Sequence, residues 1–315
     1  MRKNNEGQVL LIVLLVMATA VTVGLSVISR SVSDISVTTK EEESIRAFSA
    51  AEAGIEQILV SNVAPGGAPI QSQVGGANEA AFQASVIAFP QPNIGAGGRT
   101  EYPYPYEIAG GDSVTVWFAG HDDAGDLVCT GTGDCFIGYP FVSMCWGKQG
   151  TAVSDSTTPA VAVSIVYQDA AGSVGISKFG VDPNAPRRAL NGFIAPTAAV
   201  SSGACVSGTT WYSFLMDFDL RNQPQPPVPA AILDGVAGNG HLILMTVRML
   251  YNGNNPQTLA VMTAPGNPLP SQGRKIDSVG TAGSASRKVE VYTMYPEIPS
   301  IFQGALFSPS DIRKN

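Results

Sequence analysis

The feature that most constrains this chain is an uncharged apolar run near the amino terminus, from Val9 to Ile28. A helix rising about 1.5 Å per residue covers the roughly 30 Å core of a bilayer over such a run. Arg2 and Lys3 precede the run, and no comparable basic cluster follows it directly. The positive-inside rule therefore predicts a single-pass membrane protein with a transmembrane segment over 9–28, a cytoplasmic amino terminus and an extracytoplasmic remainder.

The helical pattern continues beyond this membrane segment. Between Ser31 and Leu59 there is no proline and one glycine, Gly54. Apolar residues recur there at the spacing of one helical face, at Ile45, Phe48, Ala51, Ile55 and Leu59. The simplest interpretation is one helix over 8–60, about 75 Å long. The alternative is a lone anchor, a break at Thr38 and Thr39, which are mediocre helix formers, and a separate short helix.

Small residues in the apolar run favour contact with other helices. Gly24 allows a neighbouring helix to approach closely, and the hydroxyls of Thr19, Thr22 and Ser26 can bond to carbonyls of their own helix. We therefore predict a helix-packing surface that includes Gly24 and, farther along, Phe48, Ala51 and Ile55.

Two segments carry a resemblance to a known family. The charged leader Met1–Gly7 and the apolar start Gln8–Val16 resemble the class III signal sequence of type IV pilins and pseudopilins. The Ala-Ala-Glu-Ala sequence within Arg46–Glu56 resembles the signature that follows the membrane helix in PilX-type and GspK-type minor pilins. The resemblance implies cleavage by a prepilin peptidase between Gly7 and Gln8. It also implies three kinds of partner: other pilin-like subunits, the inner-membrane assembly machinery, and membrane lipid before assembly.

One position departs from the family pattern. Major pilins carry a glutamate at the fifth mature position, which is thought to neutralise the amino terminus of a neighbouring subunit; counted from Gln8, that position is Ile12. A carboxylate in lipid is costly unless it is paired, so its absence removes both a burden and an assembly contact. In the family this loss is typical of filament tips. The resemblance thus implies a tip or priming subunit, with Ile12 on the helix-packing surface.

Composition limits the function of the remaining chain. With 315 residues, 44% hydrophobic and 14% charged, the chain is long enough for one large or two small domains after the helix. The net charge is -7 and no basic stripe follows the leader, so the sequence predicts no nucleic-acid binding. The 34 glycines and 22 prolines indicate many turns between short strands.

The fold class predicted from these patterns is α+β: a long amino-terminal helix followed by a β-rich, sandwich-like globular head. We expect a connector over 61–100, with a short strand at Ala81–Phe89, then the head over 101–307 and a frayed tail over 308–315. Within the head, Ile298–Phe307 is expected to fold back. Short apolar, often β-branched runs predict its strands, at Ser113–Phe118, Ala160–Tyr167, Val174–Phe179, Trp211–Phe218, His241–Tyr251, Thr258–Met262 and Ser286–Tyr295.

Two turns are expected within this head. Asp169–Ser173 joins two apolar runs and predicts a hairpin turn. Near the end of the chain, Gly280–Gly283 is expected as a turn between strands over Lys275–Val279 and Arg287–Tyr292. This final small-residue turn and strand also resemble PilX-like proteins.

Four cysteines lie on the side predicted to be extracytoplasmic: Cys129, Cys135, Cys145 and Cys205. An even number in an oxidising compartment predicts two disulfides, with three connectivities open. We favour Cys129 with Cys135, closing a glycine-rich loop, and Cys145 with Cys205, joining distant strands. A metal site is the alternative, but the spacings contain no Cys-x-x-Cys pair and no histidine lies near Cys205 in the sequence.

Catalytic patterns are scarce. The chain has two histidines, His121 and His241, and contains no Gly-x-Ser-x-Gly, His-Glu-x-x-His or Walker-type loop. We predict no enzyme activity and no cofactor. Asp122, Asp123 and Asp126 form a weak calcium candidate, but they lack the register of an EF-hand, which favours a solvated turn. The aromatic run Tyr102–Tyr106 is either a binding surface or, as we favour, packing against a sheet edge.

These observations lead to one functional expectation and one alternative. The first is a minor type IV pilin-like subunit that acts in assembly priming or at the filament tip and presents an adhesive head. The alternative is a single-pass cell-surface binding protein that does not polymerise. A mature chain starting at Gln8 would indicate the first, and a retained leader would indicate the second.

Overall fold

The computed structural model describes residues 6–76, 79–90, 100–122, 124–130, 134–236 and 238–297. The chain divides into two compact units. The helix unit comprises Met1–Val86 and Ile276–Val291, and the head unit comprises Ile87–Lys275 and Tyr292–Asn315. One long helix followed by a β-rich region confirms the predicted α+β class. The expected fold-back of Ile298–Phe307 and the tail over 308–315 lie outside the described residues.

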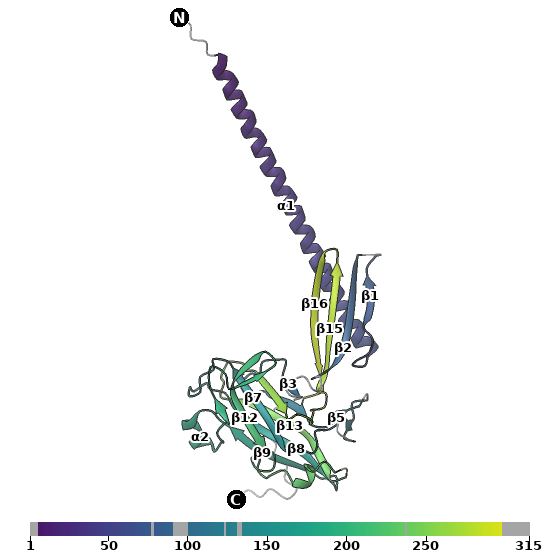
Figure 1. Ribbon diagram of the computed structural model, residues 1–315, viewed down its shortest axis with the longest axis vertical. Helices are drawn as coiled ribbons and strands as arrows, with labels where there is room; N and C mark the ends of the chain where they lie inside the picture. The colour runs from purple at the N-terminus through teal and green to yellow at the C-terminus, as the bar shows by residue number, and fades with distance from the viewer. Residues whose placement is uncertain are drawn as a thin grey trace, which may run out of the picture. The chain divides into compact units, whose positions relative to one another are not determined.

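The long helix α1 runs without a break from Glu6 to Ser61 (Figure 1). The prediction of one continuous helix is confirmed, and the alternative break at Thr38 and Thr39 is absent. Both threonines stay helical because their hydroxyls donate to carbonyls of the preceding turn, those of Asp34 and Ile35, at 2.9 Å each. A positive φ of 45° at Asn62 then ends the helix.

A four-stranded sheet accompanies the second half of α1 in the helix unit. Its strands are β1 (Ile70–Val74), β2 (Ala80–Phe89), β15 (Gly273–Ala282) and β16 (Ala285–Met294), in the order β1-β2-β15-β16. Alternate residues of β2 and β15 join helix residues in one apolar core. This core includes Ala47, Ala50, Ile55, Ile58, Phe82, Ala84, Val86 and Ile276.

The apolar residues that the sequence places on one face of α1 divide into a buried and an exposed set. Ala51 and Ile55 are buried in their own unit, whereas Ile45, Phe48 and Leu59 are 67%, 47% and 49% exposed. The reason is the close approach of strand β15, where a Cβ on Gly280 would collide with the backbone of Ala47 and Ala51. A backbone contact this close selects alanine and glycine on the helix and turns the larger side chains outward.

The chain is divided differently from the expected connector and head. Residues 70–74 form strand β1 instead of a connector loop, and Ile276–Val291 belongs to the helix unit instead of the head. The final hairpin is also longer than expected, because its turn lies at Gly283 (φ +53°) and Gly280 is inside strand β15. Glycine at position 280 serves the contact with the helix, so it does not mark a turn.

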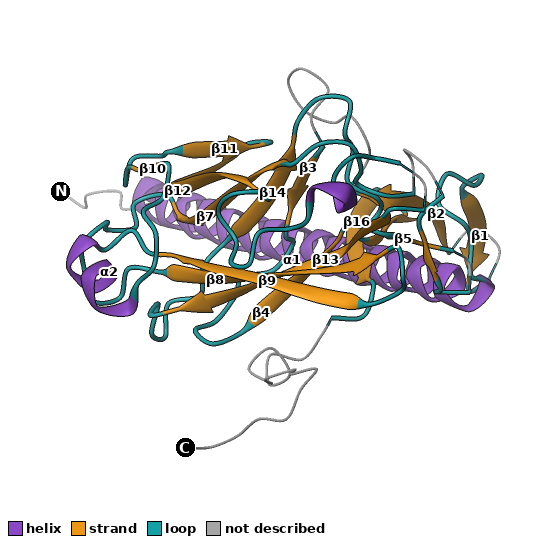
Figure 2. Cartoon of the chain, turned by 90° about the horizontal axis from the view of Figure 1, so that it is seen from below, coloured by secondary structure: helices purple, strands orange, loops and turns teal. Residues whose placement is uncertain are grey.

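The head unit is a sandwich of two antiparallel sheets, which Figure 2 shows as two layers. One sheet has the order β10-β12-β7-β14-β3, with β11 also paired to β12; the other has the order β4-β13-β8-β9. The strands of the first are β3 (Glu101–Pro103), β7 (Phe141–Lys148), β10 (Ala198–Ala199), β11 (Cys205–Ser207), β12 (Thr210–Asp219) and β14 (Leu259–Thr263). Those of the second are β4 (Ser113–Trp117), β8 (Ala160–Asp169), β9 (Val174–Val181) and β13 (Gly240–Leu250).

Both sheets contribute to one core, in which Met144, Trp146 and Phe214 from the first sheet meet Ile165 and Val247 from the second. Two further strands, β5 (Gly120–His121) and β6 (Leu127–Val128), pair with each other. The short helices are α2 (Ala185–Asn191) and the 3-10 turn η1 (Ala230–Ile232).

The seven strands expected from apolar runs are all present, but sequence reasoning missed the central strand β7 and helix α2. Strand β7 contains serine, cysteine and glycine, so it lacks the β-branched pattern used to find strands. Helix α2 is set by its ends: the side chain of Asn184 accepts from the backbone N–H of Arg187, and Gly192 closes the helix with a φ of +69°. The hairpin turn at Asp169–Ser173 is present, with the Asp169 carboxylate accepting from the N–H groups of Ala171 and Ser173.

Candidate functional site

The first half of α1 is an open apolar surface. The large apolar side chains from Leu10 to Val37 are half or more exposed. Leaving such side chains in water forfeits about 25 cal/mol for each Å² of apolar surface, so this segment requires lipid or another protein around it. Within the described residues, α1 is the one helix long and apolar enough to cross a membrane.

The helix-packing residues predicted from the sequence fall into two groups. Ile12, Gly24 and Phe48 lie on the open surface of α1, and a Cβ at Gly24 would meet nothing within 4 Å. Ala51 and Ile55 instead pack in the core of their own unit. Another apolar helix can therefore contact Ile12, Gly24 and Phe48, whereas Ala51 and Ile55 are not accessible to it. The processing residues Gly7 and Gln8 fall in the first turns of α1.

An exposed apolar stripe continues along α1 after the membrane segment. It contains Ile45, Phe48 and Leu59, which are three to four residues apart or a multiple of that spacing, and so share one side of the helix. Glu42 and Arg46 form an exposed ion pair at 2.6 Å beside it. The stripe lies beside the alanine-rich face that contacts the sheet, and its side chains are 47–67% exposed, so it is open to a second helix.

A polar clamp holds the β15–β16 turn on α1. The carboxylate of Glu43 accepts from the backbone N–H of Ser284 at 3.0 Å and from its hydroxyl at 2.9 Å. Arg287 donates to the hydroxyl of Ser44 at 2.6 and 2.8 Å. The hydrogen bond from the Ser284 backbone lowers the pKa of Glu43 below its ordinary value. Sequence reasoning missed this clamp, because its two halves are some 240 positions apart.

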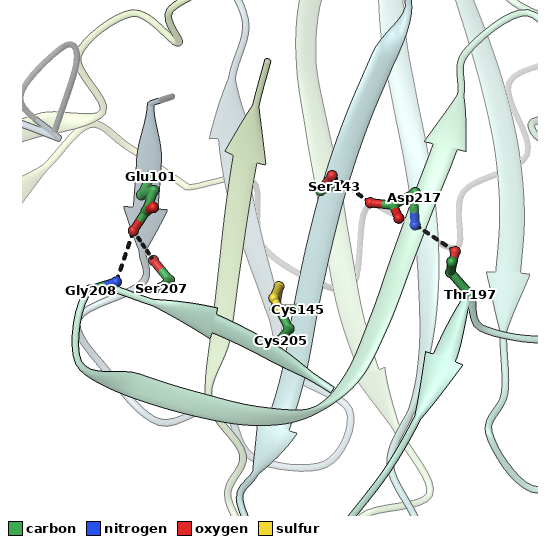
Figure 3. The surroundings of a disulfide bond; sticks show 8 residues. All are labelled: Glu101, Ser143, Cys145, Thr197, Cys205, Ser207, Gly208 and Asp217. Atoms are coloured by element: carbon green, nitrogen blue, oxygen red, sulfur yellow. Dashed lines mark hydrogen bonds between the residues drawn. A yellow bond between two sulfur atoms is a disulfide. The ribbon is translucent and has the colours of Figure 1, made fainter. Parts of the chain in front are cut away.

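Both disulfides are in the head unit and have the pairing favoured from the sequence. Cys129 is bonded to Cys135, and Cys145 on β7 is bonded to Cys205 on β11. Figure 3 shows the second bond beside the β11–β12 hairpin, whose tip is held by Glu101 of strand β3. The Glu101 carboxylate accepts from the Ser207 hydroxyl at 3.1 Å and the Gly208 N–H at 2.8 Å. The hairpin is thus fastened to two strands of the sheet.

The calcium candidate is only partly within the described residues. The Asp122 carboxylate accepts from the N–H groups of Ala124 and Asp126 at 2.9 Å each, as in a closed turn. Asp123 lies outside the described residues. In the part of the chain that the structure describes, no group of three His, Cys, Asp or Glu side chains is placed to hold a metal ion.

The two histidines occupy separate positions in the head unit. His121 stacks on Tyr295 with ring centroids 3.9 Å apart and meets Trp117 edge-on. His241 lies near the start of strand β13, as expected. Burial lowers the pKa of both imidazoles.

The aromatic run Tyr102–Tyr106 packs along an edge of the sandwich. Tyr102 on edge strand β3 is 1% exposed and contacts Phe89 edge-to-face, and Tyr104 donates its hydroxyl to Glu297 at 2.9 Å. Burial first, and then this hydrogen bond, raise the pKa of Tyr104 well above its ordinary value. Tyr102 and Tyr104 therefore pack within the head unit, which is the interpretation favoured from the sequence.

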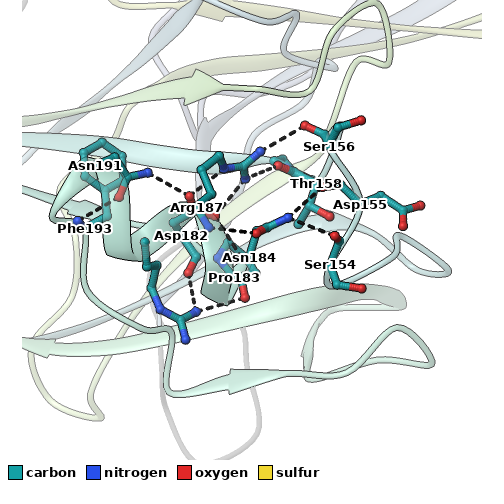
Figure 4. A network of polar contacts seen from close by, with 12 residues as sticks. Ser154, Asp155, Ser156, Thr158, Asp182, Pro183, Asn184, Arg187, Asn191 and Phe193 are labelled. Atoms are coloured by element: carbon teal, nitrogen blue, oxygen red, sulfur yellow. Dashed lines mark hydrogen bonds and ion pairs between the residues drawn. The ribbon is translucent and has the colours of Figure 1, made fainter.

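A buried ionic network lies at α2 (Figure 4). Asp182 is fully buried and receives two hydrogen bonds from Arg187, at 2.6 and 2.7 Å, and one from Asn191 at 2.9 Å. Arg187 also donates to the carbonyls of Ser156 and Thr158. Burial by itself would raise the pKa of Asp182, but these hydrogen bonds outweigh it and lower the pKa. The network fastens α2 to the loop over 154–158.

Comparisons with protein-family models, with curated proteins and with solved structures gave no match. The long apolar helix and the two disulfides of the head unit fit a single-pass membrane protein with an extracytoplasmic head. Any more specific function must therefore be inferred from the sequence and structure of this chain.

Proposed function

We propose that this chain is a minor type IV pilin-like subunit, processed after Gly7 by a prepilin peptidase and acting in assembly priming or at a filament tip. Its amino terminus faces the cytoplasm, because Arg2 and Lys3 precede the apolar run. Before assembly the helix spans the membrane, and the head unit lies on the oxidising side where its disulfides form.

The observation that carries this proposal is the division of α1 into two uses within one unbroken helix. Ala47, Ala50, Ile55 and Ile58 pack into the core with the sheet, while the large apolar side chains from Leu10 to Val37 are half or more exposed. A simple anchor needs apolar residues only across the bilayer. Here the stripe at Ile45, Phe48 and Leu59 extends the open apolar surface about 47 Å past Ile28 along the helix, which supports lateral packing of whole helices.

The choice of a tip or priming role depends on Ile12. With Gln8 as the mature terminus, Ile12 stands where the family's shaft subunits carry a glutamate. Without that carboxylate the subunit makes no ion pair to the amino terminus of a neighbour within the bilayer, and it also carries no unpaired charge into lipid. Both consequences suit a subunit with nothing ahead of it.

The proposal is tested by mapping the mature amino terminus after co-expression with an active prepilin peptidase. Intact-mass measurement is expected to show loss of Met1–Gly7, and Gly7→Leu is expected to retain it. Gly24→Ala is the matched control, because a Cβ there meets nothing within 4 Å and the change lies outside the cleavage site. Retention of the leader by the unsubstituted chain would favour the non-polymerising surface-protein alternative.

A second test concerns assembly. Phe48→Glu places a charge on the exposed stripe, where the side chain is 47% exposed and contributes little to its own unit. Co-purification of other pilin-like subunits is expected to decrease while the melting temperature of the isolated protein stays within about 2 °C. Undiminished co-purification would remove the stripe from the assembly surface.

A further inference from the structure

A polar cleft of about 400 Å³ opens on the head unit. The side chains around it are mainly amides, hydroxyls and one charge of each sign, from Lys148, Gln149, Thr151, Asp155, Asn255 and Gln257. None of these residues was singled out by the sequence patterns, because they come from three separate segments. The cleft lies at the end of strand β7, where that strand leaves the sheet at Lys148.

The walls of the cleft are held in place before any ligand arrives. The Gln257 side-chain oxygen accepts from the Lys148 N–H at 3.0 Å, and the Thr151 hydroxyl donates to the Lys148 carbonyl at 2.6 Å. The backbone at the lining residue Asp155 is held by Asn184, whose side-chain amide donates to the carbonyls of Ser154 and Asp155 (Figure 4). A rigid site binds with less loss of conformational entropy than a mobile one.

The charges of the cleft do not favour an ionic ligand. The Lys148 ammonium is already paired with Glu107 at 2.7 Å, and Asp155 adds a carboxylate that would repel an anion. A cation would find only one carboxylate in the lining. The mixture of donors and acceptors instead suits hydroxyl groups, since each hydroxyl both donates and accepts.

An exposed aromatic residue, Trp211, lies on strand β12, which pairs with the end of β7 that lines the cleft. Trp211 is 49% exposed, and a Cβ on Gly203 would lie 2.6 Å from its ring atom Cε3, so the indole covers the bare backbone of Gly203. The next residue, Tyr212, pairs directly with Lys148 of the cleft. Trp211 thus precedes the strand residue that pairs with Lys148, and the backbone of Gly203 supports its ring.

The loop beneath Trp211 is bonded to the cleft itself. The Gln149 side chain donates to the Ser202 carbonyl at 2.7 Å, and the Gly150 N–H donates to the Ser201 carbonyl at 2.6 Å. The ring and the polar groups are thus fixed to each other through residues 201–203. An apolar ring face near a set of hydrogen-bond donors and acceptors, in which the Lys148 charge is already paired with Glu107, is complementary to a sugar ring, which has C–H groups on one face and hydroxyls around its rim.

We propose that Trp211 and the cleft around Lys148, Asp155 and Asn255 form a binding site for a neutral saccharide. The C–H face of one sugar ring stacks on the indole, and hydroxyls of the same or the next ring bond to the amide and carboxylate groups of the cleft. This inference concerns the head unit alone. It holds or fails whether or not the chain is processed and assembled.

The test uses the full chain in a detergent without a sugar headgroup, such as lauryldimethylamine oxide. Neutral di- to tetrasaccharides of glucose, galactose, mannose and N-acetylglucosamine are titrated while tryptophan fluorescence is recorded. Of the three tryptophans, Trp146 is fully buried and Trp117 is partly buried against His121, so a quench or blue shift that Trp211→Phe abolishes is assigned to the exposed Trp211. At least one saccharide is expected to saturate the signal, with the same affinity by calorimetry.

Variants locate the site. Trp211→Ala and Asp155→Ala are each expected to weaken calorimetric affinity by about tenfold or more, and Trp211→Phe, which keeps a ring, is expected to retain most of it. Phe141→Ala is the matched control, because Phe141 is a 44% exposed aromatic residue at the opposite end of strand β7. Circular dichroism verifies folding of each variant. Failure of every neutral saccharide to bind, or affinity unchanged in folded Trp211→Ala, would overturn the proposal.

Discussion

Single carboxylates have unusually specific tasks in this chain, and Glu43 is the clearest case. It holds the Ser284 N–H and hydroxyl, so the turn between β15 and β16 stays on α1. Glu41 and Glu42 are close neighbours in the sequence, but neither has a bond to that turn among the described contacts. The difference between them comes from the tertiary fold, since the local sequence is almost uniform.

Glu43→Gln tests this clamp and its pH dependence. The folded-state pKa of Glu43 is lowered, so its charge stabilises the fold above the ordinary glutamate pKa of about 4.3, and the contribution is lost as the pH falls through the folded value. We expect the variant to melt at a lower temperature than the unsubstituted chain at pH 7, with a smaller difference near pH 3. Glu41→Gln is the control and is expected to match the unsubstituted chain at both. An equal deficit at both pH values would mean that the charge is not involved.

Gly280 tests the close approach of strand and helix. A Cβ there would collide with the Ala47 carbonyl and the Ala51 amide, so Gly280→Ala is expected to destabilise the helix unit by about 1–3 kcal/mol, as overpacking does. Urea unfolding measures this loss. Gly76→Ala is the control, because the nearest atoms there belong to the flexible side chain of Glu79 at 3.5 Å. Equal stability of the two variants would show that helix and strand can separate at small cost.

The outcome at individual residues follows from what periodicity can encode. The spacing on α1 correctly gave a helix, and it put Phe48, Ala51 and Ile55 on one face that was expected to pack against other helices. In the structure Ala51 and Ile55 are buried in their own unit and Phe48 is 47% exposed. A hydrophobicity pattern assumes that the largest apolar side chains are buried. The sheet reverses this because Gly280 brings its backbone against the helix, and that partner is more than 200 positions away.

At the scale of elements, α2 and its loop are stabilised by one buried ion pair and by hydrogen bonds to backbone carbonyls. Helix α2 has seven residues and buries none of them. Its position depends on Arg187, which pairs with the buried Asp182, bonds to two carbonyls of the loop and lies 4.1 Å from the centre of the Tyr251 ring. A helix so short is marginal without such tertiary contacts.

Arg187→Met is therefore expected to destabilise the head unit by about 3–5 kcal/mol, because it leaves a buried carboxylate unpaired. Arg188→Met is the matched control in the same helix. Among the described residues, the acceptors of the Arg188 side chain are the neutral carbonyls of Asp182 and Pro183, so its loss is expected to cost about 1 kcal/mol. Thermal unfolding measures both, and similar losses would mean that the ion pair adds little to the neutral hydrogen bonds.

Strand prediction succeeded where apolar runs are long and β-branched, as in β8 and β13. It failed for β7, whose residues Ser143, Cys145 and Gly147 interrupt that pattern, although β7 is central in its sheet. Cys145 is there to reach Cys205, and Gly147 has a φ of +80° against the ring of Phe214. Residues chosen for such specific contacts obscure the strand. The sequence patterns also missed the cleft beside β7. Its polar groups come from three segments that are separate in the sequence and meet only when the strands pair.

For the whole molecule, the decisive property is how one chain serves both a membrane and an aqueous compartment. The apolar half of α1 needs lipid or partner helices, while the two disulfides need an oxidising environment. Both requirements are met when the head unit is exported and Arg2 and Lys3 remain in the cytoplasm.

Protease protection tests this orientation. In spheroplasts, added protease is expected to digest the head unit, and in inverted membrane vesicles the head unit is expected to be protected until detergent is added. Replacing Arg2 and Lys3 with glutamate is expected to reduce the exported fraction, because the charge bias that sets the topology is reversed. The paired replacement of Lys40 and Arg46 with glutamine serves as control, since these cations lie after the membrane segment and their removal leaves the bias in place. Digestion confined to inverted vesicles would place the cysteines in a reducing compartment, and neither the disulfides nor the proposed assembly route would then hold.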